Sequence, residues 1–173
     1  MRPAASHRAL GVALALLCLP LPGCFYELDS PVGTPASATL DPKLLGEWRC
    51  LSGSDDKPAL LRFQAFDATQ YSVLVESPDE PGSQMRAFST GIQGVLNVQD
   101  VDDRSADARK WGLARYRLLG PDTLDLLLPK GDALRGVAPA DLPELLRKRL
   151  DDATFFESTV VCGRATRRDR PAF

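Results

Sequence analysis

Histidine is almost missing from this sequence: of the 173 residues only His7 is a histidine. His7 falls within a segment that has the features of a removed leader, so the mature chain is expected to contain no histidine. This excludes Ser-His-Asp hydrolases, Cys-His proteases and histidine-ligated metal sites. We therefore predict that the protein is not an enzyme, and we expect no catalytic residues, no metal and no cofactor.

Long apolar runs are also missing. The longest uncharged and largely apolar stretch, residues 9–22, has 14 residues, whereas a membrane-spanning helix needs about 20. Gly and Pro number 13 and 14, charged residues make up 25% and apolar residues 44% of the chain. This is a globular composition, which excludes collagen, wholesale disorder and a multi-span membrane protein.

The first 23 residues have the pattern of a secretory signal peptide, with Arg2 and Arg8 before the apolar run. The run ends in Leu21-Pro22-Gly23-Cys24, which resembles the bacterial lipobox, although Pro22 stands where Ala, Ser or Thr is usual. The resemblance implies that Cys24 is lipidated and becomes the first residue of a lipoprotein. The alternative is a plain secretory signal followed by an incidental cysteine.

Acyl chains on Cys24 would hold the protein on a membrane, since each buried methylene contributes about 0.8 kcal/mol. In bacterial lipoproteins an Asp directly after the cysteine favours retention in the inner membrane, but here the residue is Phe25. The lipoprotein resemblance therefore implies the outer membrane, with the protein facing the periplasm. Loss of Arg2 and Arg8 lowers the positive charges from 21 to 19, while 23 acidic residues remain, so the mature net charge is −4. This acidic balance argues against a nucleic-acid partner.

Four cysteines occur, and two of them, Cys50 and Cys162, remain once Cys18 is removed and Cys24 is acylated. Outside the cytoplasm such a pair is expected to form a disulfide, the alternative being two free buried thiols. Two thiolates without histidine supply too few ligands for zinc.

The rest of the chain divides into a flexible tether over residues 24–40, a domain over 41–166 and a basic tail over 167–173. A helix-capping pattern predicts one helix over 141–150. Asp141 is at the N-cap, Pro143 lies in the first turn and Glu144 is at the third helical position. The Leu residues of this helix fall on one face, which is expected to pack on the domain. Alternating apolar residues between turn residues predict eight strands joined by hairpins. The expected strands are 47–52, 59–66, 70–76, 84–91, 94–101, 111–119, 123–128 and 155–164.

Eight hairpin-connected strands avoid unpaired edges by closing into a barrel. Gly46 and Trp48 at the start of the first strand resemble the Gly-x-Trp signature of the lipocalins and the wider calycin group. In that group the Trp closes one end of the barrel and an Arg of the last strand, here Arg164, packs across it. We therefore expect a mainly β protein, an eight-stranded antiparallel up-and-down calycin-like barrel, with the helix before the last strand rather than after it as in typical lipocalins.

Two pairs of residues predict the same register for barrel closure. In an antiparallel pair of strands, the residue numbers of directly opposed residues always add up to the same value. The Cys50–Cys162 pair and the Trp48–Arg164 pair both give 212. The two pairs therefore share one face of the sheet, and Trp48 is expected under the guanidinium of Arg164.

The sequence leaves two functions open. The first is a barrel that binds a small apolar or amphiphilic molecule at the cell envelope, and the second is a solid barrel whose outer surface binds an envelope protein. Arg115 and Arg117 alternate along one strand, either as a solvated outer face or as an inward pair that binds an anionic head group. Five aromatic residues are available to fill the interior: Phe63, Tyr71, Phe88, Trp111 and Phe156.

Overall fold

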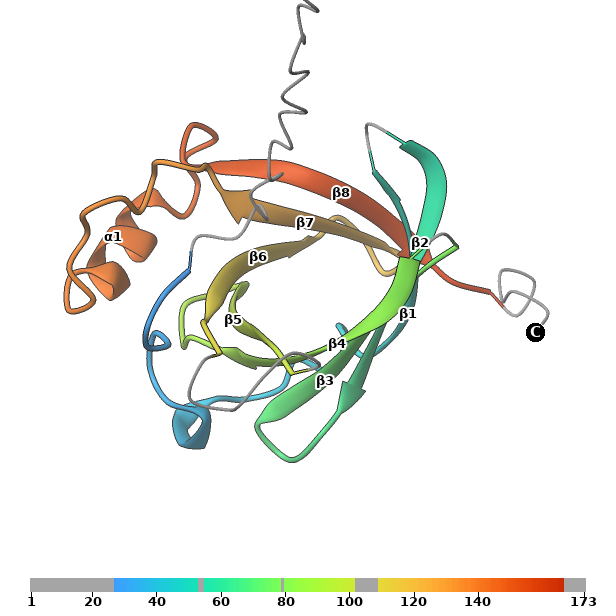
Figure 1. The fold of residues 1–173 in the computed structure, drawn as a ribbon, viewed down its shortest axis with the longest axis horizontal. Coiled ribbons are helices and arrows are strands. Elements are labelled where there is room, and N and C mark those ends of the chain that lie inside the picture. The colour runs from blue at the N-terminus through green and yellow to red at the C-terminus, as the bar shows by residue number, and fades with distance from the viewer. Residues whose placement is uncertain (1–26, 53–54, 79, 102–108, 167–173) are drawn as a thin grey trace, which may run out of the picture.

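Eight antiparallel strands close into a barrel in the computed structural model, which describes residues 27–52, 55–78, 80–101 and 109–166 (Figure 1). Each strand pairs with its neighbour in the chain, and the last pairs with the first. The prediction of eight strands, and of a single helix before the last one, is confirmed. The strands are β1 Gly46–Ser52, β2 Asp55–Ala65, β3 Gln70–Ser77, β4 Glu80–Ser89, β5 Val95–Asp100, β6 Gly112–Leu118, β7 Thr123–Pro129 and β8 Phe156–Arg164.

The two ends of the barrel are distinguished by the direction of the strands. We call the end where β1 begins and β8 finishes the closed end, because Trp48 is buried there. The far end is the one at which β1, β3, β5 and β7 finish and the even-numbered strands begin.

Two apolar clusters stabilise the fold, one on each side of the sheet, as expected for strands in which successive side chains point to opposite faces. The inner cluster lies inside the barrel. Its buried members are Leu44, Trp48, Cys50, Leu61, Phe63, Tyr71, Val73, Ala87, Leu96, Leu124 and Cys162.

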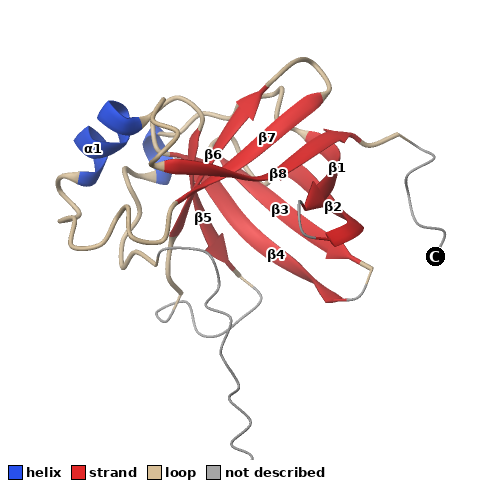
Figure 2. Ribbon diagram, turned by 90° about the horizontal axis from the view of Figure 1, so that it is seen from above, coloured by secondary structure: helices blue, strands red, loops and turns tan. Residues whose placement is uncertain are grey.

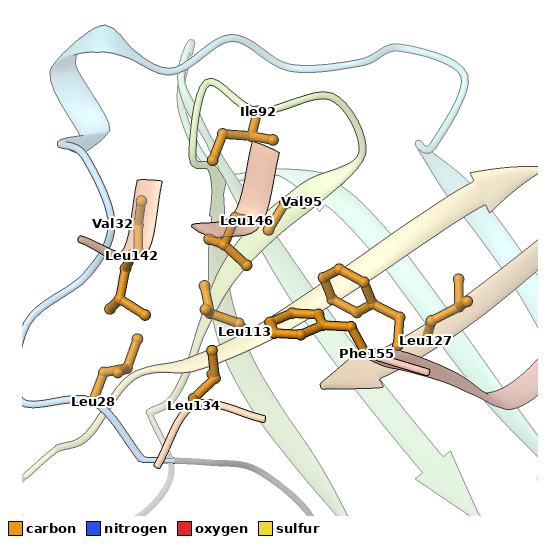
Figure 3. Close-up of a cluster of buried hydrophobic side chains, with 11 residues drawn as sticks. Leu28, Val32, Ile92, Val95, Leu113, Leu127, Leu134, Leu142, Leu146 and Phe155 are labelled. Atoms are coloured by element: carbon orange, nitrogen blue, oxygen red, sulfur yellow. The ribbon is translucent and has the colours of Figure 1, made fainter. Parts of the chain in front are cut away.

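The outer cluster lies on the outside of β5, β6 and β7, where Val95, Leu113 and Leu127 alternate with inward residues (Figure 3). It is covered by α1, Leu142–Arg149, whose buried residues are Leu142 and Leu146. The predicted apolar face of the helix is therefore confirmed. Figure 2 shows α1 outside the barrel wall, on the side away from β1 and β2.

The capping pattern at the helix start forms only in part. Asp141 occupies the N-cap position, but its side chain makes no capping hydrogen bond. Its backbone is helical, with φ −89° and ψ −15°, whereas a capping side chain reaches the helix from an extended residue. The Asp141 N–H instead donates to the carbonyl oxygen of Ala138 at 2.9 Å.

Residues 27–40 run along the outside of the barrel, drawn in blue in Figure 1, and we call them the strap. Leu28, Val32 and Ala38 are buried, and a short 3-10 helix, η1, occupies Pro35–Ser37. This differs from the flexible tether expected over 24–40, because the outer cluster offers an apolar surface that the strap covers. Cys24, on which the predicted lipidation falls, lies outside the described residues.

Three of the five aromatic residues considered for the interior lie outside it. Phe88 and Trp111 form an edge-to-face pair, with ring centroids 5.3 Å apart, and Phe156 belongs to the outer cluster. Phe88 points outward because Ala87, its neighbour, belongs to the inner cluster. Of these five residues, Phe63 and Tyr71 contribute aromatic rings to the interior, where Trp48 and the partly buried Tyr116 also lie.

Candidate functional site

The closed end of the barrel is built around Trp48 and Arg164, which lie opposite each other in the β1–β8 ladder. Trp48 is fully buried, and its Nε1–H donates to the carbonyl oxygen of Leu44 at 2.9 Å. The guanidinium carbon of Arg164 lies 3.9 Å from the centre of the Trp48 ring. The predicted register and the cation–π contact are thus confirmed.

Arg164 also ties down the chain that leads into β1. Its Nη1 donates to the carbonyl oxygen of Leu45 at 2.5 Å, and its Nη2 donates to that of Lys43. Gly46 lets this happen: its φ is +120°, and a Cβ atom there would lie 2.6 Å from Arg164 Nη1. The residues predicted to close the barrel, Gly46, Trp48 and Arg164, therefore act as one structural unit.

Asp41 meets two tyrosines beside this unit. The Tyr116 hydroxyl donates to the Asp41 carboxylate at 3.0 Å, and the Asp41 N–H donates to the Tyr71 hydroxyl at 2.5 Å. Burial, together with the nearby Asp41 carboxylate, raises the pKa of both tyrosines above the ordinary value of 10. Both phenols therefore stay neutral well above neutral pH, and they join Asp41, the residue that follows the strap, to the barrel.

The disulfide lies inside the barrel, next to Trp48. Cys50 and Cys162 are bonded, with their Cα atoms 3.9 Å apart, and both side chains belong to the inner cluster. The predicted disulfide is confirmed. Since it joins the first strand to the last, it locks the seam at which the barrel closes.

Part of the inward face is less completely buried than the core around Trp48. Besides Tyr116 and Leu118, five apolar side chains on the same face as Trp48 are only partly buried, although they point into the barrel. Val98 is two residues from the end of β5, and Met85 pairs with Asp100, its last residue. We call this group the collar, and its members are Val75, Met85, Val98, Leu126 and Val160.

Small residues on β4 and β6 lie beside the collar residue Val98 and its neighbour Leu96 on β5. Val98 pairs with Ala87 on one side and with Gly112 on the other, and Leu96 pairs with Ala114. Paired residues share a face, so all three positions lie on the inner face of the sheet. This part of the wall therefore projects little side-chain volume into the barrel.

Arg115 and Arg117 point outward, so the proposal of an inward pair for an anionic head group is wrong. Leu113 and Arg115 alternate with Ala114, which pairs with the inner residue Leu96, and with Tyr116, which packs against the inner cluster. Arg117 pairs with the buried carboxylate of Asp125.

A polar groove of about 420 Å³ lies beside these arginines on the outside of the barrel, lined also by Lys43, Tyr116 and Leu150. Arg115 forms an ion pair of 3.0 Å there with the exposed Asp151, and Arg117 is held by Asp125. An anion would have to displace a carboxylate to reach either guanidinium, so the groove is a weaker candidate for a ligand site than the collar.

Among the described residues no group of three or more His, Cys, Asp or Glu side chains could hold a metal ion. Within the same part of the chain, no helix is long and apolar enough to cross a membrane. Comparison of the chain with protein-family models, with curated proteins and with solved structures found no match.

Sequence reasoning missed the strap and its contacts. Asn97 is fully buried on the outer face of β5 and holds the backbone of Val32 through two hydrogen bonds. The side-chain amide of Asn97 within the apolar run Val95–Val98 could have indicated this contact, because a buried polar side chain needs a hydrogen-bond partner. No comparable signal marked Asp41, whose partners come from β3 and β6.

Proposed function

We propose that this protein is a non-catalytic, lipid-anchored envelope protein whose calycin-like barrel binds a small apolar or amphiphilic molecule at the collar. One observation carries the binding proposal: five apolar side chains point into the barrel and yet stay partly exposed. Burial of such a surface by an apolar ligand is favourable by about 25 cal/mol per Å².

The distribution of aromatic rings supports the same function. Large side chains close the barrel around Trp48, whereas Phe88 and Trp111 are outside and Ala87, Gly112 and Ala114 line the inner wall. A barrel of eight strands is filled by side chains or holds one small ligand. Small inward residues next to a partly exposed apolar collar favour the second arrangement.

The location proposed is the outer membrane, with the domain facing the periplasm and acyl chains on Cys24. The lipobox-like Leu21-Pro22-Gly23-Cys24 supports the anchor. The Cys50–Cys162 disulfide supports a compartment outside the cytoplasm, because disulfides persist in oxidising surroundings.

A titration with a fluorescent long-chain fatty acid tests the binding proposal, using the full chain with Cys24→Ser to remove its own acyl chains. Val98→Trp places a bulky ring inside the barrel at the collar. Val161→Trp places the same ring on the outer surface, where Val161 is 47% exposed. We expect Val98→Trp to weaken binding by about tenfold or more, equivalent to ~1.4 kcal/mol. Val161→Trp should bind as the parent protein does. Equal affinities in all three proteins, or no binding in any, would contradict the proposal.

A second candidate function, a surface that binds an envelope protein, is favoured by one observation. Leu51 and Val161 face each other across the seam of β1 and β8 on the outside of the barrel and are 54% and 47% exposed. They line a shallow groove of about 420 Å³. Crosslinking in envelopes, compared between wild type and Leu51→Lys, tests this function, since loss of one specific adduct in the variant would support it.

A further inference from the structure

The strap begins beside the far end of the barrel. Leu28 and Trp111 form an antiparallel bridge, in which the Leu28 N–H donates to the Trp111 carbonyl oxygen at 2.7 Å and the Trp111 N–H donates back at 2.9 Å. Trp111 directly precedes β6, and β6 begins at the far end. Residue 28 is therefore fixed at the end of the barrel that carries part of the collar.

Further contacts keep the strap from moving away. The Val32 N–H donates to Asn97 Oδ1 at 2.8 Å, and Asn97 Nδ2 donates to the Val32 carbonyl oxygen at 2.9 Å. Asp29 pairs with Lys110 next to the bridge. The strap passes from there to Asp41 at the closed end, so it cannot serve as slack chain between the barrel and an anchor.

We propose that the strap holds the far end of the barrel at the membrane surface, so that the amphiphile bound at the collar enters from the bilayer. The inference rests on the proposed lipid anchor. From Cys24 to Leu28 the chain advances four residues and reaches at most about 14 Å. The seven residues of β6 span about 20 Å along the strand, which is about 15 Å along the barrel axis for a strand tilt of about 40°, so even the fully extended segment falls short of the closed end. A lipidated Cys24 therefore keeps the far end, and not the closed end, beside the lipid head groups.

The partner implied is a phospholipid bilayer, and the ligand implied is a molecule with an apolar chain that already resides in it. Such a molecule would pass from the lipid to the apolar side chains of the collar with a short exposure to water. A barrel held the other way round would present Trp48, Arg164 and Gly46 to the membrane, and that end is closed.

Contact quenching in vesicles tests the orientation. The full acylated chain is reconstituted into phosphatidylcholine vesicles that contain a lipid with a nitroxide on its head group. One fluorophore is attached through Pro78→Cys in the β3–β4 turn at the far end, or through Leu119→Cys in the β6–β7 turn at the closed end, both exposed positions. The label at 78 is expected to lose much more fluorescence than the label at 119.

Insertion of roughly twelve Gly and Ser residues between Tyr26 and Glu27 supplies the control, because such a linker is flexible. The difference between the two labels should disappear in the insertion variant. Equal quenching at 78 and 119 without the insertion, or stronger quenching at 119, would overturn the orientation and leave the anchor intact. Failure of the protein to float with the vesicles would overturn the anchor, and the orientation with it.

Discussion

Nη1 of Arg164 lies 2.6 Å from the point where a Cβ atom of residue 46 would be, so the two positions are compatible only because residue 46 is glycine. This close approach lets the Arg164 guanidinium stack on Trp48 and donate to the Leu45 carbonyl oxygen at the same time. The closed end of the barrel thus depends on a residue without a side chain.

Gly46→Ala should destabilise the protein. A non-glycine residue at φ +120° carries strain of about 1 to 3 kcal/mol, and the new methyl group would also displace Arg164. Urea unfolding followed by Trp fluorescence measures the loss. Gly120→Ala is the matched control, since a Cβ atom at Gly120 meets no atom within 4 Å; equal midpoints for the two variants would contradict the role assigned to Gly46.

Removal of the disulfide should weaken the barrel at its seam. The bond closes a loop across a sequence separation of 112, for which chain entropy gives about 4 to 5 kcal/mol as an upper figure. The double variant Cys50→Ala, Cys162→Ala should therefore have a lower free energy of unfolding than the wild type. The wavelength of its maximum Trp emission should stay native, because Trp48 remains buried opposite Arg164. An unchanged free energy of unfolding in the double variant would show that the bond adds nothing to the seam.

High pH should destabilise the protein through its two buried phenols. The pKa of Tyr116 and that of Tyr71 are raised in the folded state by burial and by Asp41, so above pH 10 the unfolded chain binds fewer protons than the folded one. The free energy of unfolding must then fall as the pH rises above 10. Tyr116→Phe should flatten this fall.

Absorbance at 295 nm follows the ionisation of the phenols directly. The difference between wild type and Tyr116→Phe should show one phenol that ionises above pH 10. A Tyr116 that titrates at its ordinary pKa of 10 would mean that neither its burial nor its contact with Asp41 is maintained in solution.

Cys24→Ser should move the protein from the membrane fraction to the soluble periplasmic fraction and abolish labelling by radioactive acyl chains. The physical reason is that two or three acyl chains make attachment effectively permanent, whereas a plain secreted chain has none. Cell fractionation and acyl labelling measure both effects. Unchanged membrane association of the variant would show that another feature holds the protein there.

Alternation and turn residues predicted the barrel well, because most inward positions of the strands carry apolar residues. The register of β1 and β8 was predictable because two chemically distinct pairs, Cys50–Cys162 and Trp48–Arg164, require the same alignment of the two strands. The strap was not predictable: its Pro, Ser and Gly residues are typical of a linker, and its stability comes from Asn97 and the outer cluster. Phe88 and Phe156 were assigned to the wrong side because both faces of β4–β8 carry apolar residues.

Native mass spectrometry of the full-length protein, released from its membrane in mild detergent, tests the central claim most directly. The account predicts an acylated protein that carries one additional small amphiphile, which organic extraction removes, and predicts its loss in Val98→Trp but not in Val161→Trp. A wild-type protein that is folded, acylated and free of any such ligand, and that gains none when membrane lipids are added back, would contradict the account.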